Sequence, residues 1–199
     1  MSTILRLLSC ALLLGASLAA SAHTVIYSAT LTGPEEAPPN ASPGIGATIV
    51  TFDLDLVTMR VQAIFAGLDG TTAAAHIHCC TAAPGSGTAG VATAVPSFPG
   101  FPLGVTTGTY DATFDMTDAA SYNPAFISSN GGSVSSAMNA LIAGLDAGTA
   151  YFNVHSTSFP GGEIRGFLAA PTPAPVPLPA AGWLLGTALI GLGWRRRSA

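Results

Sequence analysis

The chain of 199 residues contains no lysine and few charges of either sign. All six basic residues are arginines, and three of them end the chain at residues 195–197. Between residues 23 and 170 only Arg60 and Arg165 oppose ten acidic residues, which gives this region a formal charge of −8. A region without a basic patch argues against nucleic acid and acidic polysaccharides as partners.

Cysteine is also scarce, with three in the chain. Cys10 lies in a predicted signal peptide, so the mature chain keeps only the neighbours Cys79 and Cys80. These two can form a disulfide in an oxidising compartment, although adjacent cysteines do so only with backbone strain. The scarcity excludes a disulfide framework, and an apolar core must therefore stabilise the domain.

Residues 1–22 are typical of a removable signal peptide. Arg6 supplies an early positive charge, residues 7–18 are apolar, and Ala-Ser-Ala at residues 20–22 is a pattern that signal peptidase accepts. The apolar run is too short to span a membrane. We therefore expect signal peptidase to cleave before His23.

The C-terminal part has a different composition. Residues 171–177 form a proline-rich linker, and residues 178–199 contain an apolar run that ends in the three arginines. Residues 177–194 reach the lower limit of length for a transmembrane helix, and arginines favour the cytoplasmic side. The sequence predicts a membrane helix here.

Residues 23–170 are predicted to form one mainly β domain. Apolar residues alternate with polar ones in several segments, which are residues 50–56, 59–65 and 110–116, with shorter candidates at 25–31, 74–79, 150–155 and 163–168. Residues 133–145 instead show helical spacing with Ser133 as a cap, and a shorter turn at 119–126 is interrupted by Pro124. We expect an antiparallel β-sandwich of about seven or eight strands with one inserted helix.

The sharpest chemical feature is His76-x-His78. On a strand, residues i and i+2 project from the same face roughly 6.6–7 Å apart, and two imidazoles at that separation can share a copper or zinc ion. His155 lies on another predicted strand and can supply a third ligand. The alternative is that the three histidines hydrogen-bond backbone and carboxylate groups and fix loops. Both interpretations stay open on the sequence.

A second motif favours a structural role. Gly161 and Gly162 permit a tight turn, Glu163 and Arg165 share a strand face and can pair with each other or with aspartates, and Asn153 can hydrogen-bond a nearby loop. The sequence contains no nucleophile elbow, phosphate-binding loop or His-Glu-x-x-His helix. We therefore name no catalytic residue and expect no enzymatic activity.

Three stretches of the predicted domain resemble the CHRD family, which is named for repeats in chordin. They are Leu-Thr-Gly-Pro-Glu-Glu-Ala-Pro-Pro at residues 31–39, Ala-His-Ile-His at 75–78, and Ala-Tyr-Phe-Asn-Val-His at 150–155 continuing to residue 168. The adjacent cysteines at residues 79–80 depart from the family pattern. The resemblance implies a β-rich extracellular module without an established enzymatic activity.

The tail resembles a PEP-CTERM sorting signal of the type that reads Val-Pro-Leu-Pro-Ala. The residues that carry this resemblance are Pro177, Pro179, Trp183, Arg195, Arg196 and Arg197. It implies a Gram-negative bacterium in which an exosortase removes the tail from the inner membrane. The protein is then passed to the cell surface or the extracellular matrix.

We therefore expect an exported, membrane- or surface-targeted, non-enzymatic CHRD module that has a binding or structural role in the cell envelope or matrix. Signal peptidase, an exosortase, the membrane and an unidentified protein or matrix component are its expected partners. The alternative is an envelope metalloprotein, with copper or zinc on His76, His78 and His155 and a capacity for redox activity.

Overall fold

The computed structural model describes residues 23–171. The predicted signal peptide, nearly all of the proline-rich linker and the predicted C-terminal membrane helix lie outside these residues. Within residues 23–171 no helix has the length and hydrophobicity needed to cross a membrane.

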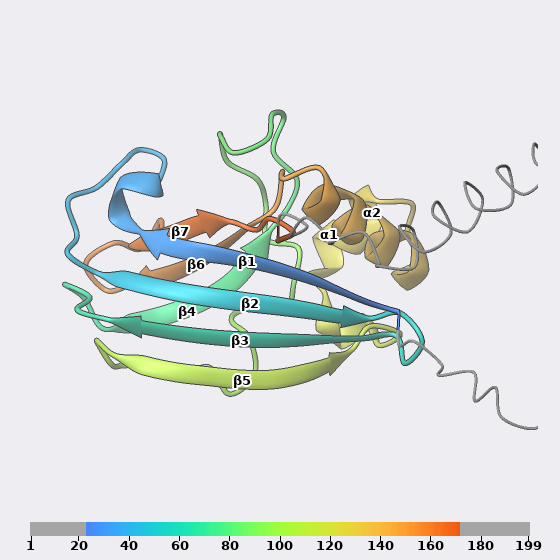
Figure 1. The fold of residues 1–199 in the computed structure, drawn as a ribbon, viewed down its shortest axis with the longest axis horizontal. Helices are drawn as coiled ribbons and strands as arrows, with labels where there is room; N and C mark the ends of the chain where they lie inside the picture. Colours follow the sequence, from blue (N-terminus) through green and yellow to red (C-terminus); the bar gives the residue numbers. More distant parts are fainter. Residues whose placement is uncertain (1–22, 172–199) are drawn as a thin grey trace, which may run out of the picture.

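The described residues fold mainly into one antiparallel sheet of seven strands, in the order β4-β6-β7-β1-β2-β3-β5 (Figure 1). The strands are β1 (Thr24–Thr32), β2 (Ile45–Asp53), β3 (Thr58–Ala66), β4 (Thr72–His78), β5 (Gly108–Asp115), β6 (Tyr151–Ser156) and β7 (Ile164–Phe167). The helices are the short 3-10 turns η1 (Gly33–Glu35) and η2 (Ala119–Ser121), and α1 (Pro124–Ser129) and α2 (Val134–Asp146).

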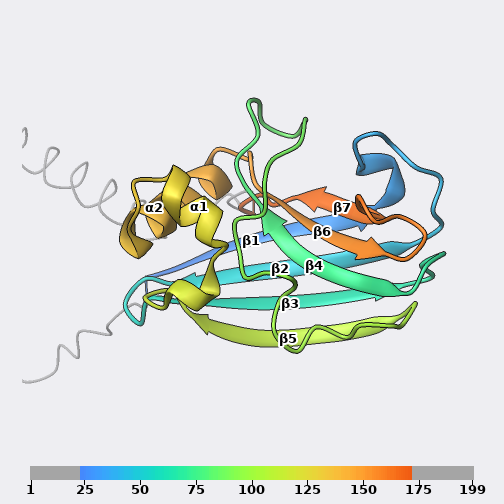
Figure 2. The ribbon, with the colours of Figure 1, turned by 180° about the vertical axis from the view of Figure 1, so that it is seen from behind.

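The expected two-sheet sandwich is instead a single curled sheet. β1 pairs with β2 along one edge and with β7 along the other, so the two halves of the domain are joined by hydrogen bonds. Figure 2 shows β4 turned across the face of β2 and β3. Phe98 closes the curl, because its ring packs against Phe152 of β6 and Phe114 of β5, with ring centroids 5.9 and 5.3 Å away. Alternation predicts which face of a strand is buried but not which strand pairs with it.

The β2–β3 turn comes earlier than the sequence pattern indicated. Leu54 and Leu56 were expected to face the core, but they are 43% and 72% exposed. The side chain of Asp53 accepts hydrogen bonds from the backbone N–H groups of Asp55 and Leu56. Such a local bond favours a turn over continued strand.

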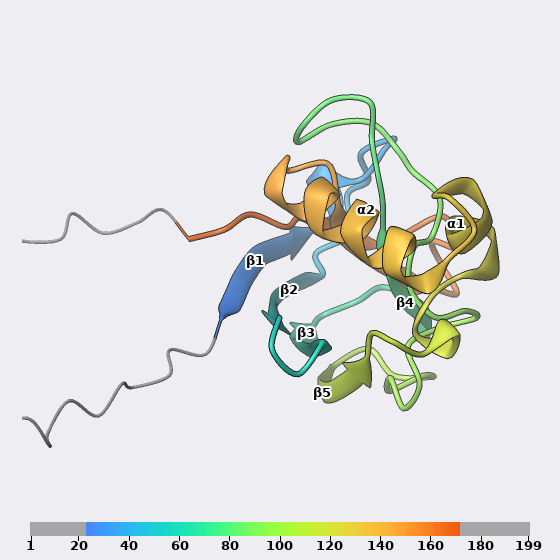
Figure 3. The same ribbon diagram turned by 90° about the vertical axis from the view of Figure 1, so that its right-hand side faces the viewer.

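Two α-helices, rather than the one expected, cover one end of the curled sheet (Figure 3). Ser133 caps α2 as predicted, and the structure adds a capping box between Ser133 and Ser136. The short helical turn expected at residues 119–126, interrupted by Pro124, is η2 followed by α1. Proline is tolerated at the first helical position, and Asn123 caps α1. The Tyr27 hydroxyl of β1 donates to Asp146 of α2 at 2.6 Å and joins helix to sheet.

Cys79 and Cys80, whose state the sequence left open, form a disulfide at the end of β4. Both sulfur atoms lie against Gly144 of α2, where any side chain would collide with them. The segment that follows the disulfide returns along β4, because the Ala92 N–H donates to the Ile77 carbonyl at 2.9 Å.

β4, β6 and β7 carry the polar residues on the face opposite the core. The core face of these strands holds Ile77, Phe152 and Ile164, all fully buried. The opposite face aligns residues in register across the three strands, in the rows His76–Asn153–Arg165 and His78–Tyr151–Phe167. Most of this second face is also buried, because the loops after β4 and β6 and the η1 turn contact it through backbone carbonyls that accept from its side chains.

Candidate metal centre

The structure brings together the three histidines that the sequence singled out. His76 and His78 project from β4, and His155 projects from the neighbouring strand β6. One ring nitrogen from each lies within 4.8 Å of the other two. Such a triangle has a common point no more than about 2.8 Å from each nitrogen, against zinc–imidazole bonds of about 2.0–2.1 Å. A small inward movement of the rings is enough to reach bonding distance.

Each imidazole uses one nitrogen to bond a backbone carbonyl. These pairs are His76 Nε2 with Pro96 O at 2.6 Å, His78 Nδ1 with Ala89 O at 2.9 Å, and His155 Nδ1 with Pro160 O at 3.0 Å. A carbonyl only accepts, so the ring nitrogen in each pair carries the proton. The other nitrogen of each neutral ring then has a free lone pair, as in metal-binding histidines, which donate their second N–H to a carbonyl or carboxylate.

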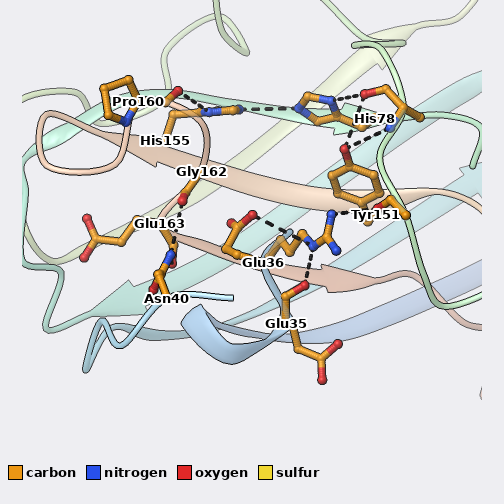
Figure 4. Close-up of polar contacts among 12 residues, drawn as sticks. Glu35, Glu36, Asn40, His78, Tyr151, His155, Pro160, Gly162 and Glu163 are labelled. Carbon is orange, nitrogen blue, oxygen red and sulfur yellow. Dashed lines mark hydrogen bonds and ion pairs between the residues drawn. The ribbon is translucent and has the colours of Figure 1, made fainter. Parts of the chain in front are cut away.

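The free nitrogens leave a gap that a cation would fill. Nε2 of His78 and Nε2 of His155 are 3.4 Å apart (Figure 4), which is about the separation of two nitrogens bound tetrahedrally to one metal at about 2.0–2.1 Å. Nδ1 of His76 is buried and has no hydrogen-bond partner among the described residues. Lone pairs that face one another without a proton or a cation between them are unfavourable.

Burial keeps these imidazoles neutral. His76 and His78 are 6% and 8% exposed, and burial lowers the pKa of all three rings below the usual value near 6.5. The pKa of His78 falls to about 4, mainly through burial and further through its imidazole neighbours. Neutral imidazole is the form that binds metal, so the cluster is in its metal-binding form at neutral pH.

Arg165 lies beside the histidine cluster and does not pair with Glu163. Its side chain is 4% exposed and lies 3.9 Å from the Glu36 carboxylate, while its guanidinium donates to the carbonyl groups of Glu35 and Gly87. Glu163 precedes β7 and turns the other way. Its carboxylate accepts from Ser42, Asp69 and Gly70. The two residues therefore anchor separate loops.

Glu36 is a buried acid that sequence reasoning did not single out, although it lies within the CHRD-like stretch at residues 31–39. Burial raises its pKa to about 7, and Arg165 only partly opposes this rise. Its Oε1 atom and Oδ1 of Asn153 are buried without hydrogen-bond partners among the described residues. Asn153 was expected to hydrogen-bond a loop, and a hydrogen bond from its side chain to Glu36 lowers the pKa of that carboxyl.

Gly162 explains how Glu36 and Asn153 fit so closely. A Cβ atom at Gly162 would lie 2.6–2.7 Å from side-chain atoms of both residues, and the backbone there has φ 136°. Asn40 fixes this turn, because its Nδ2 donates to the carbonyls of Gly162 and Glu163 at 3.3 and 3.0 Å. A Cβ atom built on Gly161 would have no atom within 4 Å. Of the two glycines, only Gly162 therefore lacks room for a side chain.

The comparisons with known proteins agree with both resemblances seen in the sequence. Residues 175–197 match the PEP-CTERM protein-sorting motif, which marks an exported, envelope-targeted protein that an exosortase processes. No curated protein and no solved structure matches the chain. Residues 27–168 match the CHRD domain, a span that includes the three histidines, Glu36 and Arg165 and exceeds half of the chain. The chain belongs to the CHRD domain family.

Proposed function

We propose that the protein is an exported, non-enzymatic component of the cell envelope or extracellular matrix that binds one copper or zinc ion through His76, His78 and His155. The observation that carries this proposal is the hydrogen bonding of the three rings. Each ring gives one N–H to a carbonyl, and the nitrogens left free converge.

The chemistry of the donor set supports copper or zinc. Three neutral imidazoles offer nitrogen alone, and imidazole suits zinc and copper, whereas calcium and magnesium require mainly oxygen ligands. The domain is acidic, and its net negative charge opposes the binding of a cation less than a net positive charge would. Three protein ligands leave a fourth position for water or a donor from a partner.

The sorting motif supports the cellular side of the proposal. In this scheme signal peptidase removes residues 1–22, the C-terminal helix holds the protein in the inner membrane, and exosortase then releases it to the surface or matrix. The disulfide between Cys79 and Cys80 suits an oxidising compartment. The domain then acts by binding a protein or matrix component and not by turning over a substrate.

Titration of the purified, metal-free protein with zinc and with copper tests the metal site. We expect a stoichiometry of one, loss of binding in His78→Ala, and retention in His23→Ala. His23 is the matched control because its side chain is 76% exposed and pairs with Asp55 away from the cluster. Absence of binding at micromolar metal, or binding that survives His78→Ala, contradicts the proposal.

A further inference from the structure

Tyr151 lies between a metal-site histidine and a buried cation. Its ring stacks on His78, with centroids 4.8 Å apart and planes 6° from parallel. The guanidinium carbon of Arg165 lies 4.8 Å from the centroid of the same ring. β6 runs between β4 and β7 in the sheet, so His78 of β4 and Arg165 of β7 reach Tyr151 from the two strands that flank it. The three side chains form one stack across three strands.

The same stack holds the backbone that bonds His78. The Ala89 carbonyl accepts from His78 Nδ1 at 2.9 Å and from the Tyr151 hydroxyl at 3.3 Å. The Ala89 N–H donates to the Tyr151 hydroxyl oxygen at 3.2 Å. Two residues earlier, the Gly87 carbonyl accepts from Arg165 Nη1 at 2.9 Å. Tyr151 and Arg165 therefore hold the peptide groups of residues 87–89 against the face of the sheet that lies opposite the core.

This arrangement decides which nitrogen of His78 is available. A neutral imidazole carries its proton on one of two nitrogens, and the hydrogen bond that the ring makes selects the tautomer. With the Ala89 carbonyl fixed at Nδ1, the proton stays on Nδ1 and the lone pair of Nε2 faces His155. Without that carbonyl, the proton can move to Nε2 and block the metal position.

We propose that Tyr151 and Arg165 are positioning residues of the metal centre. They hold the Ala89 carbonyl against His78 and so keep Nε2 of His78 free for the ion. This inference rests on the proposed metal-binding function. Neither residue is a ligand itself, because the phenol bonds Ala89 and the guanidinium bonds carbonyl groups and faces Glu36.

Arg165 adds a second constraint to the loops around the site. Its guanidinium joins Glu35, at the end of the η1 turn, to Gly87 in the loop after β4. It also lies 5.5 Å from the centroid of the Phe167 ring. A lysine at this position keeps the charge but cannot reproduce the planar fork of donors or its stacking. Arg165→Lys therefore separates geometry from charge.

The decisive variant is Tyr151→Phe, which keeps the ring stacked on His78 and removes the hydroxyl that bonds Ala89. We expect zinc affinity to fall by up to the roughly 10- to 100-fold that follows loss of an outer-shell partner, because the Ala89 carbonyl loses its support but is not removed. The visible spectrum of the cobalt-substituted protein should also change. Tyr110→Phe is the matched control. Its hydroxyl likewise donates to a backbone carbonyl, that of Pro99 at 2.9 Å, and we expect no change there.

A measurement without metal separates this inference from the function on which it rests. Nitrogen-15 NMR of the imidazoles in the metal-free full-length protein should show His78 protonated at Nδ1 alone. In Tyr151→Phe and Arg165→Lys we expect both tautomers. If the wild-type protein shows this tautomer but binds neither zinc nor copper, the proposed function fails, while the control of the His78 tautomer by Tyr151 and Arg165 stands.

The positioning role is overturned by one clear result. If Tyr151→Phe keeps wild-type zinc affinity, the cobalt spectrum and the single Nδ1 tautomer, Tyr151 does not position His78. Circular dichroism and thermal melts establish that each variant is folded. Should Arg165→Lys fail to fold, Tyr151→Phe decides the question, because it removes one oxygen from a side chain whose ring contacts remain.

Discussion

Nε2 of His78 and Nε2 of His155 lie 3.4 Å apart, and the hydrogen bonds of both rings place their protons on the opposite nitrogens. Two acceptors therefore face each other beside Nδ1 of His76, which has no hydrogen-bond partner within residues 23–171. The metal-free protein bears an electrostatic cost at this point. A bound cation would convert that cost into a stabilising contact, so the proposed metal binding predicts a more stable sheet.

Zinc should raise the thermal stability of the protein. An ion that binds only the folded state at 100 times its dissociation constant adds about 2.7 kcal/mol to the free energy of unfolding. Calorimetric melts with and without zinc measure the shift, and a chelator should reverse it. We expect the shift to persist in His23→Ala. An equal shift in His155→Ala would show that zinc acts elsewhere.

Replacing Glu36 by glutamine should change how stability depends on pH. The folded pKa of Glu36 is raised to about 7, so between its ordinary value and pH 7 the folded state holds a proton that the unfolded state has released. The protonated Glu36 therefore contributes to the stability of the fold. This contribution is fully present below about pH 4.5 and is lost as pH rises through 7.

Between pH 5 and pH 8 the free energy of unfolding of the wild-type protein should therefore fall by about 2–3 kcal/mol relative to that of Glu36→Gln. Urea unfolding at the two pH values gives this difference directly. Glu35→Gln is the neighbouring control, because Glu35 is exposed and contributes only its backbone carbonyl to Arg165. The same pH trend in Glu36→Gln would assign the effect to another group.

Replacement by alanine should destabilise the protein at Gly162 but not at the adjacent Gly161. Gly162→Ala places a Cβ against Asn153 and Glu36 in a backbone conformation that alanine rarely adopts. We expect the backbone strain and the steric overlap together to lower the free energy of unfolding by about 3 kcal/mol or more. Gly161→Ala has open space at the Cβ position and should change stability by less than about 0.5 kcal/mol. Equal losses in chemical denaturation would contradict this account.

Deleting Arg195, Arg196 and Arg197 should disturb sorting and leave the folded domain unchanged. The arginines lie within the matched sorting motif, and positive charge holds the cytoplasmic end of a membrane helix. Cell fractionation and the apparent mass of the protein measure location and tail removal. Arg60→Gln is the control outside the motif. Unchanged processing and location in the deletion would contradict the sorting role of these residues.

Much of the fold was predictable because alternation is a local property. The segments at residues 25–31 and 59–65 became β1 and β3, and the alternating apolar residues of β3 are buried as expected. The helical spacing at 133–145 became α2. The sandwich prediction failed because the pairing of β1 with β7 joins residues far apart in the chain. The role of Phe98 in the core was also not predictable from the sequence, because the segment that carries it has no regular alternation of apolar and polar residues.

For the site, the sequence alone determined that His76 and His78 share a strand face, because two-residue spacing on a strand leaves no other geometry. It also contains the PEP-CTERM motif that marks export and sorting, because this motif is a linear pattern. Only the tertiary structure decided that His155 joins the pair, that Arg165 pairs with Glu36 and not Glu163, and that each imidazole keeps one nitrogen free. These relationships depend on strand register and on loops folding over the sheet, and both are set by contacts between distant parts of the chain.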